Sequence, residues 1–110
     1  DALVLIGDDT TYLADILIDR SQAMALQENW RGAEQDLDRA LDVAPQNAVA
    51  FRLRAIARMN QNAFDLAVAD AVRAVALAQS DIEALLVLGL TREAQRTQTP
   101  VATAPAVPMP

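Results

Sequence analysis

The sequence predicts an all-α protein, in which five helices form antiparallel pairs stacked as a short solenoid. Apolar residues recur at intervals of three and four, which is the spacing of one face of an α-helix. The breaks between these stretches are about three or four residues long, so successive helices should lie side by side and antiparallel. The sequence also superposes on itself at a 34-residue shift, which carries Leu17 onto Phe51 and Phe51 onto Leu85, as expected of a repeat protein. We call this the repeat shift.

The first two helices are predicted from the apolar spacing and from the residues that break it. The first helix is expected over about residues 12–28, and the second over about 33–44. Pro45 ends the second helix because proline cannot continue one, and Asn47 is a good N-cap for the next.

The remaining helices follow the same signals. The third is expected over residues 48–60 and the fourth over about 64–78. The fifth is expected to begin at Ser80, because Ser80 and Glu83 form the pattern of a capping box, and to fade near Arg96.

The N-terminal segment, residues 1–11, has an apolar run at 2–6 followed by turn-forming and capping residues at 7–11. It is open to two interpretations. It is either a short N-terminus that docks as a strand or a loose cap, or the remnant of a preceding helix. The second follows from the periodicity, since the repeat shift carries Leu3 onto Leu37.

The repeat domain is therefore expected to span residues 12–96, followed by a tail at 97–110. This tail contains four of the five prolines and no charged residue. A Pro/Ala-rich composition of this kind predicts neither helix nor strand.

The composition excludes several classes of function. The chain has 23 Ala and 9 Arg but no Lys, His or Cys, so it lacks zinc-finger, haem and disulfide ligands and has no thiol or imidazole nucleophile. A net charge of −6 disfavours nucleic acid and anionic lipid as partners. The longest apolar run in a helix, residues 84–90, is far shorter than a membrane span. We expect no cofactor.

One acidic cluster could hold a cation or act as a catalytic pair. Asp8 and Asp9 are adjacent and are followed by two threonines. Such residues more commonly cap a helix and complement its dipole, and no other ligand-type residue converges on them. We therefore expect no metal or catalytic site.

The repeats match at polar as well as apolar positions. Identities at the repeat shift include Arg20/Arg54, Gln27/Gln61, Asp36/Asp70 and Arg39/Arg73. The first copy reads Leu17-x2-Arg20-Ser21-x2-Met24, then Ala33-x3-Leu37, Ala40 and Pro45. The second reads Phe51-x2-Arg54-Ala55-x2-Arg58, then Ala67-x3-Ala71 and Ala74. A third keeps Leu85-x2-Leu88-Gly89-x2-Arg92.

This pattern resembles the tetratricopeptide repeat (TPR) family, with about two and a half repeats over residues 14–96. The resemblance implies a right-handed solenoid in which small residues let paired helices cross closely. It implies protein binding but no particular partner, because the same scaffold serves many.

Two Arg–Asp pairs are expected to link the helices of each hairpin. Arg20 and Arg54 stand where the family usually has leucine, and Asp36 and Asp70 each follow sixteen residues later. We interpret them as structural bridges, because a partly buried guanidinium needs a carboxylate. An exposed anion site built from both arginines is the functional alternative.

The resemblance also implies a binding groove on the concave face, formed by the first helix of each pair. Its lining would be Ile18, Asp19, Gln22, Leu26, Arg52, Leu53, Ile56, Met59, Leu86, Val87 and Leu90. TPR proteins that bind the acidic C-terminus of a chaperone use Lys, Asn and Arg. This chain has no Lys and has Ile18, Leu86 and Val87 at those positions, so a hydrophobic segment or amphipathic helix is the expected ligand.

The fifth helix and Trp30 offer further candidate contacts. Residues 84–90 are apolar on every side of the predicted helix, so we expect a partner chain, a second copy or the tail to cover it. Trp30 lies at the turn of the first hairpin, where a packing anchor is expected first and an interface contact second.

Taken together, the sequence predicts a non-catalytic protein-interaction module: an adaptor, assembly factor or accessory subunit of a larger complex. A self-associating structural fragment is the alternative, and an enzyme that uses carboxylates alone is a distant third. The Ala-rich, Lys-free composition resembles bacterial proteins. A chain that begins at Asp1 is expected in the periplasm if a signal peptide has been removed, whereas trimming would leave the compartment open.

Overall fold

Residues 6–98 are described by a computed structural model, and within this range the chain is helical with no strand. The helices are α1 (Ile6–Leu26), α2 (Trp30–Val43), α3 (Ala48–Asn60), α4 (Phe64–Leu77) and α5 (Ile82–Thr97). The prediction of five helices and an all-α fold is confirmed. The predictions for residues 1–5 and for the tail from residue 99 onward fall outside the described part.

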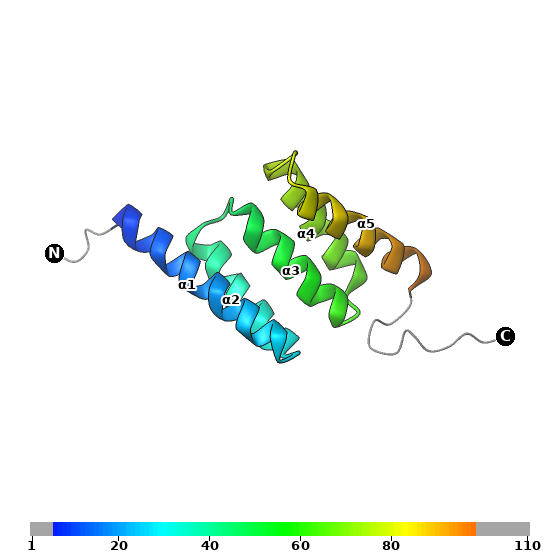
Figure 1. Cartoon of the computed structure of the whole chain (residues 1–110), viewed down its shortest axis with the longest axis horizontal. Helices are drawn as coiled ribbons and strands as arrows, with labels where there is room; N and C mark the ends of the chain where they lie inside the picture. The colour runs from blue at the N-terminus through cyan, green and yellow to red at the C-terminus, as the bar shows by residue number, and fades with distance from the viewer. Residues whose placement is uncertain (1–5, 99–110) are drawn as a thin grey trace.

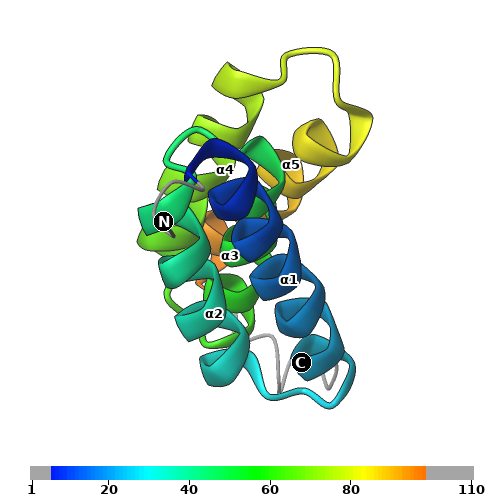
Figure 2. The ribbon, with the colours of Figure 1, turned by 90° about the vertical axis from the view of Figure 1, so that its left-hand side faces the viewer.

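The helices form two layers. In Figure 1, α1, α3 and α5 lie side by side in front, and α2 and α4 lie behind them; Figure 2 shows the same arrangement from the end that carries α1. We call α1, α3 and α5 the front layer. Each pair α1/α2 and α3/α4 packs as a hairpin, and α2 contacts α3 while α4 contacts α5. The stack is therefore a short solenoid in which α1 and α5 each have neighbours on one side.

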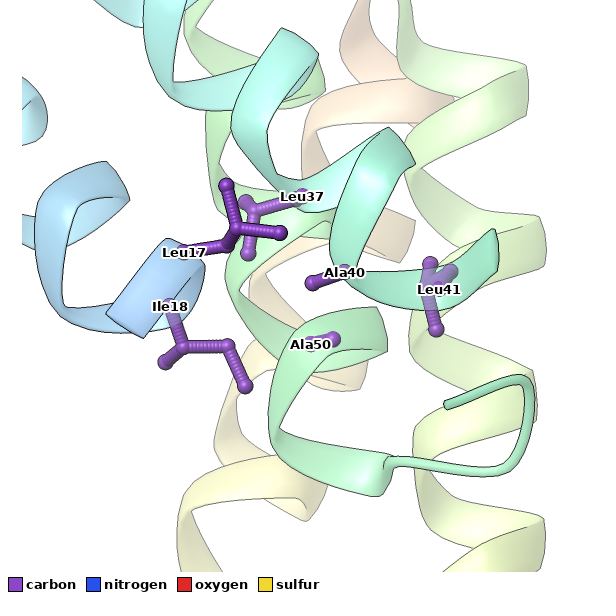
Figure 3. Packing of buried hydrophobic residues seen from close by; sticks show 6 residues of the cluster. All are labelled: Leu17, Ile18, Leu37, Ala40, Leu41 and Ala50. Carbon is purple, nitrogen blue, oxygen red and sulfur yellow. The ribbon is translucent and has the colours of Figure 1, made fainter. Parts of the chain in front are cut away.

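The core is built from a few large side chains set among alanines. In the first hairpin, Leu17 and Ile18 of α1 pack with Leu37 of α2 and with Ala50 of α3, together with Ala40 and Leu41 (Figure 3). A second cluster joins Ala55, Ala71 and Val87 from α3, α4 and α5. Alanine lets helix axes approach closely, so stacking buries apolar side chains in both clusters despite the low aromatic content.

The starts of three helices differ from the sequence prediction. The helix expected from about residue 33 begins at Trp30, three residues earlier. The helix expected from about residue 12 begins at Ile6, so residues 7–11 are helical rather than a turn. Acidic residues in a first turn complement the positive end of the helix dipole, which favours helix over a turn at Asp8 and Asp9. The N-cap of α5 is Asp81 rather than Ser80: its Oδ1 accepts a hydrogen bond from the Glu83 backbone N–H at 3.0 Å.

The turn inside each hairpin is the same structure, recurring once per repeat. Glu28 and Asn62 are related by the repeat shift, and both have positive φ, of 61° and 65°. In each turn the next backbone N–H bonds back to the preceding helix, from Asn29 to Met24 O at 2.9 Å and from Ala63 to Arg58 O at 2.8 Å. The residue with the left-handed backbone conformation ends the helix and lets the chain reverse direction within three residues.

Replacing Glu28 with glycine is expected to stabilise the protein. Glycine removes the strain of holding a side chain at positive φ, which costs the folded protein about 1–2 kcal/mol. Glycine also gives the unfolded chain more conformational entropy, which cancels roughly 0.5–1 kcal/mol of that gain. We expect a net gain of about 0.5–1 kcal/mol in the free energy of unfolding, measured by urea titration. Gln27→Gly is the control and should lose stability; a loss for Glu28→Gly as well would contradict the strained conformation.

Candidate functional site

An apolar pocket lies between α1, α2 and α3, with a volume of about 130 Å³. Its lining is Ser21, Gln22, Ala25, Trp30, Ala33, Leu37, Leu53, Ile56 and Ala57. Of these, Gln22 is exposed, and Trp30, Leu53 and Ile56 are partly exposed. The pocket can therefore accept an apolar side chain from outside the molecule.

Local structure at the start of α2 fixes the position of Trp30. Asn29 is the N-cap, and its Oδ1 accepts a hydrogen bond from the Gly32 backbone N–H at 3.0 Å. A Cβ atom added at Gly32 would lie 2.7 Å from the Sδ atom of Met24 on α1. The end of α1 and the start of α2 can approach this closely because residue 32 has no side chain. This close packing presents the indole ring to the pocket.

The residues expected in the groove fall into different surroundings. Gln22 of α1 lines the pocket, as do Leu53 and Ile56 of α3. Met59, also on α3, is partly exposed. Asp19, Leu26, Leu86 and Leu90 are exposed.

Arg52 takes part in a contact between repeats. Its Nη1 lies 3.0 Å from Glu83 Oε1, which links α3 to α5, and its side chain is largely buried.

Two residues expected in the groove are buried instead. Ile18 packs against Leu37 and Ala50, and Val87 packs against Ala55 and Ala71. Neighbouring helices of the front layer are in direct contact, α1 with α3 and α3 with α5. Positions that face along this layer therefore lie between helices and stabilise the stack, so Ile18 and Val87 are not available to a ligand.

Both Arg–Asp pairs form two-pronged ion pairs between the helices of a hairpin. Arg20 donates from Nε and Nη2 to Asp36 at 2.8 and 2.7 Å. Arg54 donates from the same two nitrogens to Asp70, each at 2.9 Å. Asp36 and Asp70 are buried, so each guanidinium satisfies both oxygens of a carboxylate that water cannot reach.

The second pair belongs to a larger network that the sequence reasoning missed. Arg54 Nη1 also donates to Asp38 on α2 at 2.9 Å. Arg58, one turn later, donates to Glu34 on α2 at 2.8 Å and to Asp70 on α4 at 2.9 Å. Two arginines of α3 thus connect the two hairpins. The recurrence of the Arg20–Asp36 spacing in Arg54–Asp70 predicted the pairs within each hairpin. It could not predict contacts between repeats, because those do not recur in the first hairpin.

The network shifts the pKa of several of its members. Hydrogen bonds from Arg20 hold the pKa of Asp36 below its ordinary value against the opposing effect of burial. Burial raises the pKa of Glu34, but hydrogen bonds from Arg58 and Gln61 outweigh it, so the net shift is downward. For Arg54, burial lowers the pKa and the bonds to Asp70 and Asp38 raise it, with a net upward shift.

These shifts predict acid sensitivity. Because the pKa values of Asp36 and Glu34 are lowered in the folded state, their stabilising contribution is complete above the unfolded values of about 4 and is lost as the pH falls through the folded values. We expect the free energy of unfolding to decline as the pH is lowered below about 5. Urea titrations from pH 7 to pH 3 measure this. An Asp36→Asn/Glu34→Gln variant should show a shallower decline, and an unchanged slope would contradict the assignment.

Among the side chains that the structure describes, those of residues 10–98, the acidic residues nowhere form a group of three or more that could hold a metal ion. Asp8 and Asp9 belong to α1, and the placement of their side chains lies outside the described part. No helix in the described range is both long and apolar enough to cross a bilayer.

The fold and pocket define a class of protein: a two-layer helical repeat scaffold with an apolar recess between α1, α2 and α3. Solved structures of other proteins share this fold, among them the following two. An Arabidopsis OM64 TPR domain superposes with a TM-score of 0.75 and 20% identity, covering 80% of this chain and 73% of the other. The UNC-45 chaperone, studied for the features critical for binding and folding muscle myosin, superposes with a TM-score of 0.75 and 24% identity over 88% of this chain.

This chain spans 11% of the length of the UNC-45 chain. No protein-family profile and no curated protein sequence matches it. The two structures show that the chain has the fold of a TPR domain, which confirms the resemblance seen in the repeat pattern.

Proposed function

We propose that this protein is an interaction module, acting as an adaptor, assembly factor or accessory subunit, and that it binds an apolar segment of a partner protein along its front layer. The observation that carries the proposal is the pocket of about 130 Å³ between α1, α2 and α3, which has an apolar lining and an open mouth. Interaction is also the role that the TPR-like fold suggests.

The chemistry of the surface specifies the kind of segment. Leu53 and Ile56 of α3 form an apolar side of the pocket, and we expect Leu90, which is exposed on α5, to extend this strip. An amphipathic helix fits such a strip with apolar residues at intervals of three and four. The net charge of −6 favours a partner whose polar face is basic, since complementary charge speeds association.

Trp30 gives a direct measure of whether the pocket is occupied, because it is the single tryptophan of the chain and lines the pocket. The probe is a synthetic amphipathic helix with leucines on one face and lysines on the other. Titration should change the Trp30 emission in a saturable manner, and Leu53→Asp should weaken binding at least tenfold. Circular dichroism checks that each variant remains helical.

Two further variants distinguish binding in the pocket from non-specific binding of the peptide to other apolar residues on the surface. Gln22→Phe should block the pocket from its exposed mouth and weaken binding without removing any core residue. Leu66→Asp is the matched control: Leu66 is an exposed leucine on α4 that does not line this pocket. Equal weakening by Leu66→Asp and Leu53→Asp would mean that the peptide binds non-specifically, and no saturable change in Trp30 emission would refute the pocket.

A further inference from the structure

One face of α5 is apolar and uncovered. Ile82, Leu85 and Leu86 are 71%, 48% and 61% exposed, and Gly89 continues the same face one turn later. We call these four residues the α5 face. Large apolar side chains gathered on one helix face in this way commonly mark an interface.

The repeat shows what kind of element fits this face. Applied twice, the repeat shift carries Ala14, Leu17, Ile18 and Ser21 of α1 onto the four residues of the α5 face. Those residues of α1 are between 1% and 7% exposed. They are covered because α2 packs antiparallel on α1 and α3 follows in the stack. The α5 face is therefore shaped for an antiparallel helix in the place that α2 takes on α1.

Gly89 supports a close helix crossing at this face. Its counterparts Ser21 and Ala55 are small and buried at 1% and 0% exposure, where α2 and α4 cross α1 and α3. A Cβ added at Gly89 would meet no atom within 4 Å, so the packing of the described residues does not require glycine there. Glycine is unfavourable inside a helix compared with alanine. A second helix packed against Gly89 would account for the missing side chain.

We propose that the α5 face binds the α5 face of a second copy, forming an antiparallel pair with two-fold symmetry. Charge supports this occupant. Asp81 and Arg92 flank the face at opposite ends. They are eleven residues apart, which is about three helical turns, so both lie along the same edge of the helix. Antiparallel pairing brings Asp81 of each copy toward Arg92 of the other. Among the described side chains, those of residues 10–98, Arg92 has no ion-pair partner of its own.

Self-association is measured on the full chain by sedimentation equilibrium. A contact between single helices is smaller than a standard interface, so concentrations from about 10 µM to 1 mM should span the transition. Leu85→Glu should weaken dimerisation at least tenfold and leave the helical circular dichroism unchanged, because Leu85 is exposed in the monomer. Leu66→Glu, on a comparably exposed leucine of α4, should leave dimerisation unchanged.

A cysteine placed on the face tests the geometry directly, because the natural sequence contains no cysteine. Two-fold symmetry brings each residue near the axis close to its own copy, so Leu86→Cys should form an intermolecular disulfide under mild oxidation. Leu66→Cys should not.

Three outcomes would overturn the proposal: a monomer up to 1 mM, a dimer that survives Leu85→Glu, or a monomer whose α5 face is covered by its own tail or by another protein's helix. The groove proposal fails separately, since Leu53→Asp should leave the dimer intact and Leu85→Glu should leave the Trp30 response intact.

Discussion

Replacing Asp70 with alanine is expected to lower the free energy of unfolding by about 3–5 kcal/mol, a large part of the stability of a small domain. Asp70 is buried on α4 and accepts hydrogen bonds from both Arg54 and Arg58. Removing it leaves two largely buried guanidinium groups without their shared carboxylate. Urea titration followed by circular dichroism measures the loss.

The double variant Arg54→Leu/Asp70→Ala distinguishes lost pairing from lost packing. It removes one of the two guanidinium groups that have lost Asp70 and should recover part of the stability, because an apolar residue avoids the cost of burying a charge whose two-pronged partner is gone. Asp38→Ala is the second control. Asp38 bonds to Arg54 but is about half exposed, so its loss should cost no more than about 1 kcal/mol. Equal losses in the single and double variants would contradict the pairing.

Replacing Leu37 with alanine should have an effect of similar size. Leu37 is 1% exposed, contributes to the first core cluster and also lines the pocket. Shortening a fully buried leucine removes apolar contact and leaves a cavity, at a cost of about 2–5 kcal/mol. Thermal and urea unfolding should both report the change.

A leucine on the surface provides the comparison for this variant. Leu66→Ala, at a mostly exposed position on α4, should change stability by no more than about 0.5 kcal/mol. The second repeat carries Ala71 at the position of Leu37 and packs it with Val87 and Ala55. A small effect of Leu37→Ala would mean that the helices of the first hairpin can move together around an alanine as those of the second do. It would contradict the expectation that the substitution leaves a cavity.

The fold was largely predictable because the same types of residue recur at equivalent positions in successive repeats. The repeat shift indicated both hairpins, and the sixteen-residue spacing of Arg54 and Asp70 indicated which side chains would meet across one. The start of α1 was not predictable in this way. Glycine, aspartate and threonine at residues 7–11 are typical of turns, yet acidic residues are also favourable in the first turn of a helix.

The candidate site was less predictable than the fold. Position within the repeat identified Gln22, Leu53 and Ile56, which line the pocket, but the same counting placed Ile18 and Val87 at the surface. Whether a front-layer residue is open or buried depends on how closely the next repeat packs, and helical spacing carries no information on that distance. The contribution of Trp30 depends on the close approach at Gly32, which is a three-dimensional feature.

The arginines of α3 influence whether the two hairpins unfold together or separately. Arg54 and Arg58 share Asp70 on α4, and each also holds one carboxylate on α2, so the two hairpins cannot separate without breaking the bonds to Asp38 and Glu34. In a linear array the interface between neighbouring units sets whether they melt one at a time or together. This interface strongly couples the two hairpins, and we expect calorimetry to show a single heat-absorption peak whose van't Hoff and calorimetric enthalpies agree.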